Sequence, residues 1–202
     1  MIEGKLVNLR AIEPADAERF FRWVNDREVM RTLMPRYPWS FESEKEWAES
    51  ASKPIEFGDV KLAIDTKDGK HIGTCGLHRG RPEDRHAELG IMIGEKECWS
   101  QGYGTDAMTT VLRFAFHQMN LNKVSLGVFE TNERAQAVYR KLGFVEEGRF
   151  REDYYQDGRY WDIVRMSVLR REFEGAREQE SIGTIEQFNN RSRAGDGTRP
   201  PV

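Results

Sequence analysis

Cysteine is scarce in this chain of 202 residues, since only Cys75 and Cys98 occur. They form no CxxC pair, and the 4 histidines include no set at metal-ligand spacing. A disulfide framework and a metal site are therefore not expected. Two small buried thiols are the favoured interpretation.

Long apolar runs are also missing. The longest, around residues 89–93, is much too short to cross a bilayer. The first five residues lack the basic and then apolar profile of a secretory signal. We therefore expect a cytoplasmic protein with no membrane partner.

Neither sign of charge dominates the sequence, because 31 basic and 34 acidic residues give a formal net charge of −3. A general nucleic-acid binder needs a clear basic surplus to displace counterions, so no nucleic-acid partner is expected. Hydrophobic residues make up 38% of the chain, which suffices for one packed core.

Apolar patterning and turn residues predict an α/β arrangement. An alternating stretch that ends near Arg10 predicts a strand, Pro14 begins a helix, and Ser40 or Ser43 can cap a second helix. The remaining elements are three strands (60–64, 71–77, 88–93), a helix (102–119), a strand (124–129), a helix from residue 131 or 132 to Gly143, and a hairpin (144–155, 160–169). This order predicts a mixed sheet with helices on both faces rather than regular βαβ alternation.

The composition changes near residue 173. Beyond it Glu, Arg, Gln, Asn and Gly dominate, and few large apolar residues remain. We expect residues 1–172 to form the domain and residues 173–202 to form a polar, mobile tail.

The sharpest local feature is a glycine turn, Trp-Ser-Gln-Gly-Tyr-Gly at residues 99–104. Two glycines before a helix let backbone N–H groups approach an anion, and the helix N-terminus favours phosphate. The candidate phosphate-binding residues are Ser100, Gln101, Gly102, Tyr103, Gly104 and Thr105. Two other interpretations stay open, a dinucleotide turn of the GxGxxA type and a helix start that binds nothing. The polar stretch before the turn, and the lack of an acid about 20 residues after it, count against the dinucleotide.

A second pattern lies on the later predicted helix, which ends at Gly143. Asn132 and Tyr139 are seven residues apart, which on a helix is 700°, within about 20° of two full turns. Both side chains therefore point the same way. Asn132 can also be a simple N-cap, and Tyr139 can be a half-buried core tyrosine.

Together, these two segments resemble the GNAT acetyltransferase superfamily, and the likeness in element order covers about residues 4–171. The motifs at 23–26, 146–148 and 157–162 are most similar to the RimJ/RimL-type branch, and the last two equally resemble spermidine N-acetyltransferases. The resemblance implies a mixed, mostly antiparallel sheet of seven strands flanked by about four helices. One departure is Trp99, where the superfamily usually has Arg or Gln. An indole cannot pair with phosphate, so binding would rest more on backbone N–H groups.

The resemblance also implies acetyl-CoA as the acyl donor, with no metal. The glycine turn would hold the pyrophosphate, and backbone groups of the strand end Ile91, Met92 and Ile93 would hold the pantetheine arm and the oxyanion. Asn132 and Arg134 complete the predicted cofactor-binding set, although a solvated helix face is the simpler interpretation of Arg134. The strands on either side of the 102–119 helix are expected to splay apart and admit the thioester.

Two residues are predicted to be catalytic. A tyrosine with a pKa of about 10 can protonate a departing thiolate of about 8.5, so Tyr139 is the expected general acid. Glu88 is the expected proton acceptor, with a structural ion pair as an equal alternative. His86 and His78 are weaker candidates for the base.

The resemblance favours a protein N-terminal α-amine as acceptor, with a polyamine second. An acyl-CoA-binding module without turnover, and an oxidoreductase that uses the same glycines, are the alternatives from other classes. A homodimer is possible because the sheet has exposed edges.

Overall fold

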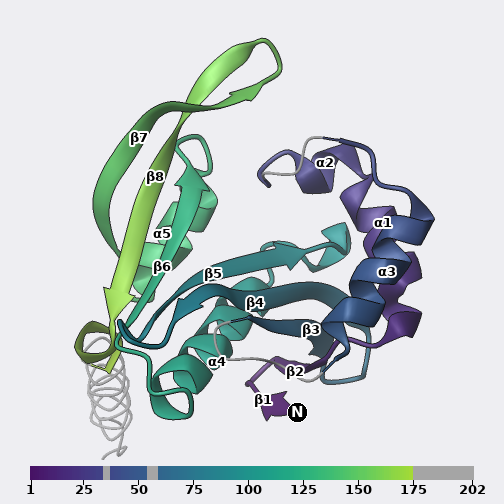
Figure 1. The fold of residues 1–202 in the computed structure, drawn as a ribbon, viewed down its shortest axis with the longest axis horizontal. Coiled ribbons are helices and arrows are strands. Elements are labelled where there is room, and N and C mark those ends of the chain that lie inside the picture. The colour runs from purple at the N-terminus through teal and green to yellow at the C-terminus, as the bar shows by residue number, and fades with distance from the viewer. Residues whose placement is uncertain (34–36, 54–58, 175–202) are drawn as a thin grey trace, which may run out of the picture.

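One mixed sheet organises the residues that the computed structural model describes, which are 1–33, 37–53 and 59–174 (Figure 1). Its strands are β1 (Ile2–Glu3), β2 (Val7–Ala11), β3 (Val60–Thr66), β4 (His71–Arg81), β5 (His86–Ile93), β6 (Lys123–Phe129), β7 (Val145–Gln156) and β8 (Arg159–Leu169). The helices are α1 (Ala17–Val24), α2 (Arg27–Met30), α3 (Phe41–Ala51), α4 (Tyr103–His117) and α5 (Glu133–Lys141), with short 3-10 turns η1 (Pro14–Asp16) and η2 (Lys96–Cys98).

The strand order is β1-β2-β3-β4-β5-β6-β8-β7. Every neighbouring pair is antiparallel except β5 and β6, which are parallel. The predicted mixed, mostly antiparallel sheet is therefore confirmed. The described residues contain eight strands rather than seven, because the two-residue β1 is too short to show any alternation in sequence.

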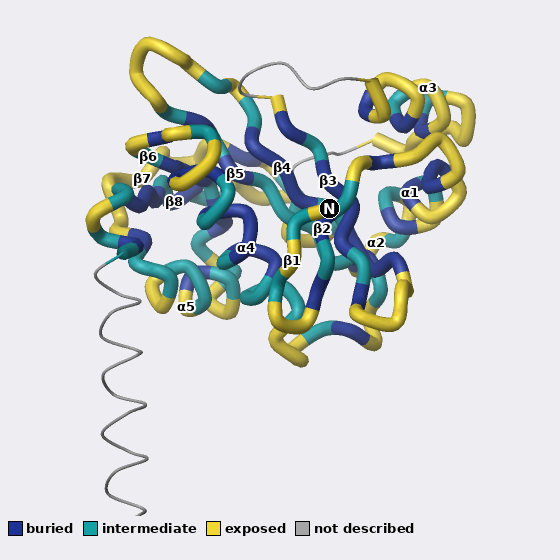
Figure 2. The backbone as a smooth tube through the Cα atoms, turned by 90° about the horizontal axis from the view of Figure 1, so that it is seen from below, coloured by how far each residue is buried: buried dark blue, intermediate teal, exposed yellow. Residues whose placement is uncertain are grey.

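Helices cover both faces of the sheet (Figure 1), and buried residues follow the strands between the layers (Figure 2). Side chains of α4 pack in one core cluster with strands from β2 to β8. Side chains of α1 and α3 pack in a second cluster on the opposite face. Strand residues therefore alternate between the two clusters, which fixes the face of each side chain.

Local capping explains most helix boundaries. Ser40 caps α3 by accepting a hydrogen bond from the backbone N–H of Ser43 at 3.1 Å. Pro14 begins η1 rather than one continuous helix, and a separate turn, α2, starts after Asp26. The Asp26 carboxylate accepts from two N–H groups of that turn, so the chain restarts there instead of extending α1.

A buried ion-pair network holds η1 on the sheet. Asp16 accepts two hydrogen bonds from Arg10, at 2.7 and 2.9 Å, and the Nδ1 atom of His71 lies 3.1 Å from the same carboxylate. The Nε atom of Arg10 also donates to Asp65 at 2.7 Å. One arginine thus joins β2, η1 and β3.

The C-terminal end of the described chain packs against α4. Phe173, the first residue of the expected tail, is buried and packs against Phe116 of α4 with ring centroids 5.5 Å apart. Residues 175–202, the rest of that segment, lie outside the described residues. Within the described ranges, no helix is long and apolar enough to cross a membrane.

Candidate active site

The central feature of the site is a separation between β5 and β6. The two strands pair only at three rungs, the last of which joins Glu88 to Ser125. Both then continue, to Ile93 and Phe129, without further pairing to each other. Figure 1 shows the sheet opening at this place. The splay that the resemblance implied is therefore present.

The backbone of β5 presents alternate residues to this opening. The carbonyl of Ile93 accepts a hydrogen bond from Trp99, so it faces away from β4. Gly94, the next residue, donates its N–H to Ile72 on β4. Because direction alternates along a strand, the N–H and C=O groups of Ile91 face the opening, whereas those of Met92 face β4. Of the three predicted residues, Ile91 and Ile93 thus have backbone groups on the β6 side, and the Ile93 carbonyl is already used by Trp99.

The glycine turn lies at the start of α4, where β5 gives way to the helix. Gly102 is the N-cap and has φ +87°, a left-handed conformation that favours glycine. Ser100 also has positive φ, at 61°. No side chain caps α4 within the described residues, so its first N–H groups remain directed outward at the positive end of the helix dipole.

The first turn of α4 is fastened from outside the motif. The carboxylate of Asp106 accepts from the backbone N–H groups of Lys5, Leu6 and Val7, at 3.1, 2.7 and 3.0 Å. This contact joins residues about 100 positions apart. Sequence reasoning missed it, because nothing local to Asp106 marks its partners.

The Trp99 side chain contacts the end of β5 and the α1–α3 cluster. Its indole N–H donates to the Ile93 carbonyl at 2.8 Å, and its ring packs at the edge of the α1–α3 cluster. The guanidinium of Arg134 lies over the same ring, 5.4 Å from its centroid, and donates to the hydroxyl of Ser100 at 3.4 Å. The structure therefore brings Arg134 from α5 to the glycine turn.

Other predicted members of the turn contribute only main chain. The side-chain amide of Gln101 donates to the carbonyl of Glu97, and Tyr103 packs against the α4 core cluster. The carbonyl of Thr105 accepts from the hydroxyl of Thr109, one turn along α4. Any anion held here would meet backbone N–H groups, as the sequence indicated.

Helix α5 carries the second predicted motif. Asn132 is its N-cap and accepts from the N–H of Ala135 at 3.2 Å, which confirms the capping interpretation. Tyr139 is partly buried against the α4 core cluster, with its ring 5.8 Å from that of Phe144. Burial raises the pKa of the Tyr139 phenol to about 12. The hydroxyl therefore stays protonated at neutral pH and is available as a proton donor.

Gln136 is a second positioning residue that the sequence did not reveal. Its buried side chain donates to the carbonyls of Phe129 and Glu130, at 3.2 and 3.0 Å, and accepts from Arg140 at 3.0 Å. These contacts hold the free end of β6 onto α5. An isolated Gln on a helix carries no pattern that predicts such contacts.

Glu88 stands at the last rung before the strands part. One carboxylate oxygen accepts from Arg165 at 2.7 Å and the other from Arg79 at 3.0 Å. Burial raises its pKa, but the Arg165 hydrogen bond and the two positive charges outweigh that effect, so the pKa lies below its ordinary value. The carboxylate is ionised at neutral pH.

The two histidines differ in their surroundings. His86 contacts Arg81 through Nδ1 and Ser125 through Nε2, both at 2.8 Å. Arginine can only donate, so Nδ1 accepts and the proton lies on Nε2. Burial lowers the pKa of His86, which keeps it neutral. His78 is more exposed and lies 3.3 Å from Asp59.

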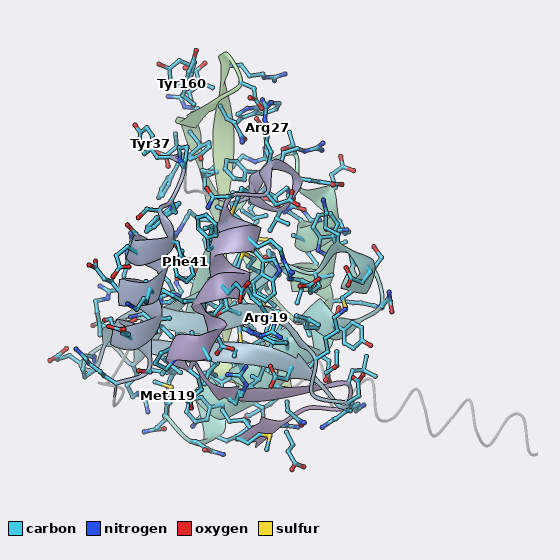
Figure 3. All side chains as sticks on the ribbon, turned by 90° about the vertical axis from the view of Figure 1, so that its right-hand side faces the viewer. Arg19, Arg27, Tyr37, Phe41, Met119 and Tyr160 are labelled. Carbon is cyan, nitrogen blue, oxygen red and sulfur yellow. The ribbon has the colours of Figure 1, made fainter. Side chains whose placement is uncertain are left out.

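Helix α2 and the β7–β8 hairpin contact each other at the hairpin turn. The turn residues of the hairpin, Asp157 and Gly158, both have positive φ, 51° and 85°, as the predicted two-residue turn requires. The guanidinium of Arg27 on α2 reaches Asp157, at 3.4 Å. Figure 3 shows Arg27 and Tyr160, at the hairpin tip, toward the same end of the molecule.

Cys75 and Cys98 are both buried and free, and burial raises the pKa of each thiol. In the part of the chain that the structure describes, no cluster of three or more His, Cys, Asp or Glu residues could hold a metal ion.

The chain is similar to known proteins in both sequence and fold. Residues 7–145 match a family described as Acetyltransferase (GNAT) domain. The "Putative ribosomal N-acetyltransferase YdaF" of Bacillus subtilis is 30% identical over 177 residues, 84% of this chain and 94% of that protein. The "Spermidine N(1)-acetyltransferase" of Vibrio cholerae is 29% identical over 168 residues, 83% of this chain and 95% of that protein. A crystal structure of spermidine N-acetyltransferase from Vibrio cholerae, in complex with CoA and spermine, has a TM-score of 0.77 and 27% identity, and the match covers 83% of this chain and 98% of that one.

Proposed function

This chain belongs to the GNAT acetyltransferase family and is an acyltransferase, and from that premise we propose that it transfers the acetyl group of acetyl-CoA to a primary α-amine at a protein or peptide N-terminus. The amine attacks the thioester directly. The new C–N bond forms as the C–S bond breaks, the amine loses a proton and the CoA thiolate gains one.

The separation of β5 and β6 is the observation that carries this proposal. Beyond the rung of Glu88 and Ser125, the β5 edge offers its backbone N–H and C=O groups to a bound molecule instead of to β6. An extended arm that contains amide groups can pair with such an edge as a strand would. The glycine turn lies at the far end of the same edge, where it suits a diphosphate.

The cofactor-binding residues proposed here are those of the turn and the strand edge. Ile91 and Ile93 supply the edge, with Met92 between them, and the main chain of residues 100–105 supplies the N–H groups. Arg134 adds a positive charge beside Ser100. Asn132 fixes the first turn of α5 and so the place from which Arg134 extends.

Tyr139 is proposed as the general acid. It lies on α5, on the α4 face of the sheet, and its phenol carries its proton at all ordinary pH values because burial raises the pKa to about 12. The conjugate thiol of the departing thiolate has an ordinary pKa of about 8.5, and the sulfur becomes more basic as the C–S bond breaks. The proposed role of Tyr139 is therefore to donate a hydrogen bond that stabilises the charge developing on sulfur and to pass its proton late in bond cleavage.

Glu88 is proposed as the group that receives the amine proton, directly or through water. Its lowered pKa makes it a weak base, and this favours an acceptor that is easily deprotonated. An α-amine, with a pKa of about 8, is neutral a few hundred times more often at pH 7 than a lysine-type amine with a pKa of about 10.4. This difference supports an N-terminal α-amine over a polyamine.

A polyamine is the second candidate, supported by the likeness to the Vibrio cholerae spermidine N-acetyltransferase. The test is thiol release from acetyl-CoA with a panel of N-terminal peptides, spermidine and an aminoglycoside. Release with peptides and little with spermidine supports the proposal. Release with spermidine alone selects the second candidate, and acetyl-CoA binding without any release indicates a binding module.

A further inference from the structure

We propose that Arg165 and Arg79, with Glu88 between them, form an acceptor subsite for a carboxylate close to the reacting amine. The acceptor would then be a peptide with an acidic residue beside its N-terminal residue, or a free amino acid, rather than a polycation. This inference rests on the proposed transfer to an α-amine and adds that a carboxylate lies close to that amine in the acceptor.

The three side chains form one arrangement of charges. Arg165 Nη2 donates to one oxygen of Glu88 at 2.7 Å, and Arg79 Nη1 donates to the other at 3.0 Å. Two positive charges therefore surround one negative charge. The local surplus of one positive charge is complementary to an acceptor that brings an amine and a carboxylate together.

The face on which these groups lie follows from strand alternation. Ala87 and Leu89 belong to the core cluster that contains α4, so Glu88 points to the other face. Met92, which shares that direction, packs with the α1–α3 cluster. Tyr139 packs with the α4 cluster, on the opposite side of the sheet. The opening between β5 and β6 thus has the proposed acid on one face and the charged group on the other.

Arg165 reaches Glu88 by crossing β6. It is paired with Gly127, which has no side chain, and Ser125 is paired with Glu88 on the other side of the same strand. The absence of a side chain at Gly127 leaves the surface of β6 open for the guanidinium. The ion pair thereby spans the sheet just where the two strands begin to part.

Each arginine keeps donors for a second anion. Glu88 uses one nitrogen of each guanidinium, and a guanidinium has five N–H donors. In residues 1–33, 37–53 and 59–174, the Arg165 guanidinium also lies over the Phe150 ring, 5.8 Å from its centroid, and Arg79 makes no further hydrogen bond or ion pair. Guanidinium groups bind carboxylates through two nitrogens at once, which these unused donors allow.

The surroundings define how the acceptor would approach. Above Arg165 on β8, Ile163 and Trp161 share its face and pack with Phe129 and Tyr154 in a small apolar cluster. Side-chain exposure is 25% for both Arg165 and Glu88 and 79% for Arg79. The acceptor would therefore contact an apolar wall on one side and reach the charged group from solvent, with its amine toward Glu88 and its carboxylate toward the arginines.

The experiment compares matched acceptors at saturating acetyl-CoA. Peptides that begin Ser-Asp and Ser-Asn differ by one charge, and glutamate and its α-amide test a free amino acid in the same way. Spermidine is the polycation. Within a pair that discriminates, we expect kcat/KM to be at least tenfold higher for the acceptor with the carboxylate than for its amide, mainly because its KM is lower. Which pair responds distinguishes a side-chain carboxylate from an α-carboxylate.

Variants locate the effect. Arg79→Gln and Arg165→Gln should each reduce the acid preference toward unity without changing the KM for acetyl-CoA, and Arg165→Lys should keep part of it. Arg149→Gln is the matched control, because Arg149 pairs with Glu146 on the same hairpin but is opposite Val164, which points to the α4 face. It should keep the full preference. Arg79 is exposed, so its variant tests the subsite even if Arg165→Gln fails to fold.

Equal use of the Asp and Asn peptides and of glutamate and its amide, or a preference for spermidine, would overturn this inference while leaving an N-acetyltransferase in place. Thiol release from no acceptor would overturn the proposed function instead. In that case calorimetric titration of the same peptides decides the subsite: binding selective for the acid and lost in Arg79→Gln supports it, and no selectivity refutes it.

Discussion

The indole N–H of Trp99 donates to the carbonyl of Ile93 across 2.8 Å, which ties the end of β5 to the glycine turn. The residue that departs from the superfamily pattern therefore has a contact of its own within the protein. It sets the distance between strand edge and turn, and its ring supports Arg134. The positive charge comes from α5 instead of from the turn itself.

Trp99→Phe tests this relationship, because phenylalanine keeps a ring beneath Arg134 but has no N–H. One lost hydrogen bond is worth about 1 kcal/mol. The KM for acetyl-CoA should therefore rise roughly fivefold, whereas kcat changes little. Steady-state kinetics measures both. A fall in kcat alone would contradict the assignment of Trp99 to the binding of the donor.

Tyr139→Phe tests the proposed general acid. The ring stays packed beside Phe144, so the fold and the affinity for acetyl-CoA should be retained. Loss of the proton donor should lower kcat roughly 100-fold. Calorimetry of acetyl-CoA binding separates affinity from turnover, and unchanged turnover would show that Tyr139 is only a packing residue.

Gly102→Ala tests the conformation of the turn. At φ +87° a Cβ is strained by about 1–2 kcal/mol, and it would also lie 3.3 Å from the side chain of Leu6. We expect weaker binding of acetyl-CoA and a lower thermal midpoint. Gly148→Ala is the matched control, since a Cβ there meets nothing within 4 Å and the backbone is ordinary. Equal effects in both variants would refute the argument.

Asp16→Asn tests the buried network beneath η1. Burial raises the pKa of Asp16, but contacts with His71 and Arg10 outweigh it, so the folded-state pKa lies below the unfolded one. A depressed pKa stabilises the fold above the unfolded value, near pH 4, and that stability is lost as the pH falls through the folded value. The variant should lose about 3 kcal/mol at pH 7.

The measurement for Asp16 is urea unfolding of both proteins at several pH values. The difference in unfolding free energy between wild type and Asp16→Asn should be greatest at pH 7 and shrink as the pH falls below about 4. A difference that does not change with pH would show that the ionised carboxylate contributes nothing. Asp84→Asn serves as a control, because Asp84 pairs with Arg81 at the surface.

Features with local causes could be predicted from the sequence. Asn132 caps α5 because the backbone N–H that donates to it, that of Ala135, is only three residues away, and Gly143 ends the helix with φ +89°. The turn at Asp157 requires only its own two residues. For the same reason the glycine turn, the hairpins and the order of elements along the chain needed no knowledge of distant contacts.

Features made by distant partners could not be predicted. The hydrogen bond between Arg165 and Glu88 joins residues 77 positions apart, and no pattern in either strand marks it. The sequence supports a base and an ion pair equally at Glu88, and only the positions of the two arginines show the pairing. Gln136 and Asp106 are similar cases, since each holds backbone groups of another element.

Three rungs between β5 and β6 join the two halves of this sheet. A molecule that pairs with the β5 edge and contacts the β6 side would act as a temporary additional strand, and it would brace the sheet where only these rungs hold its two halves together. A molecule bound between β5 and β6 should therefore slow amide hydrogen exchange in both halves of the sheet at once. Binding and the loss of backbone flexibility would then be coupled.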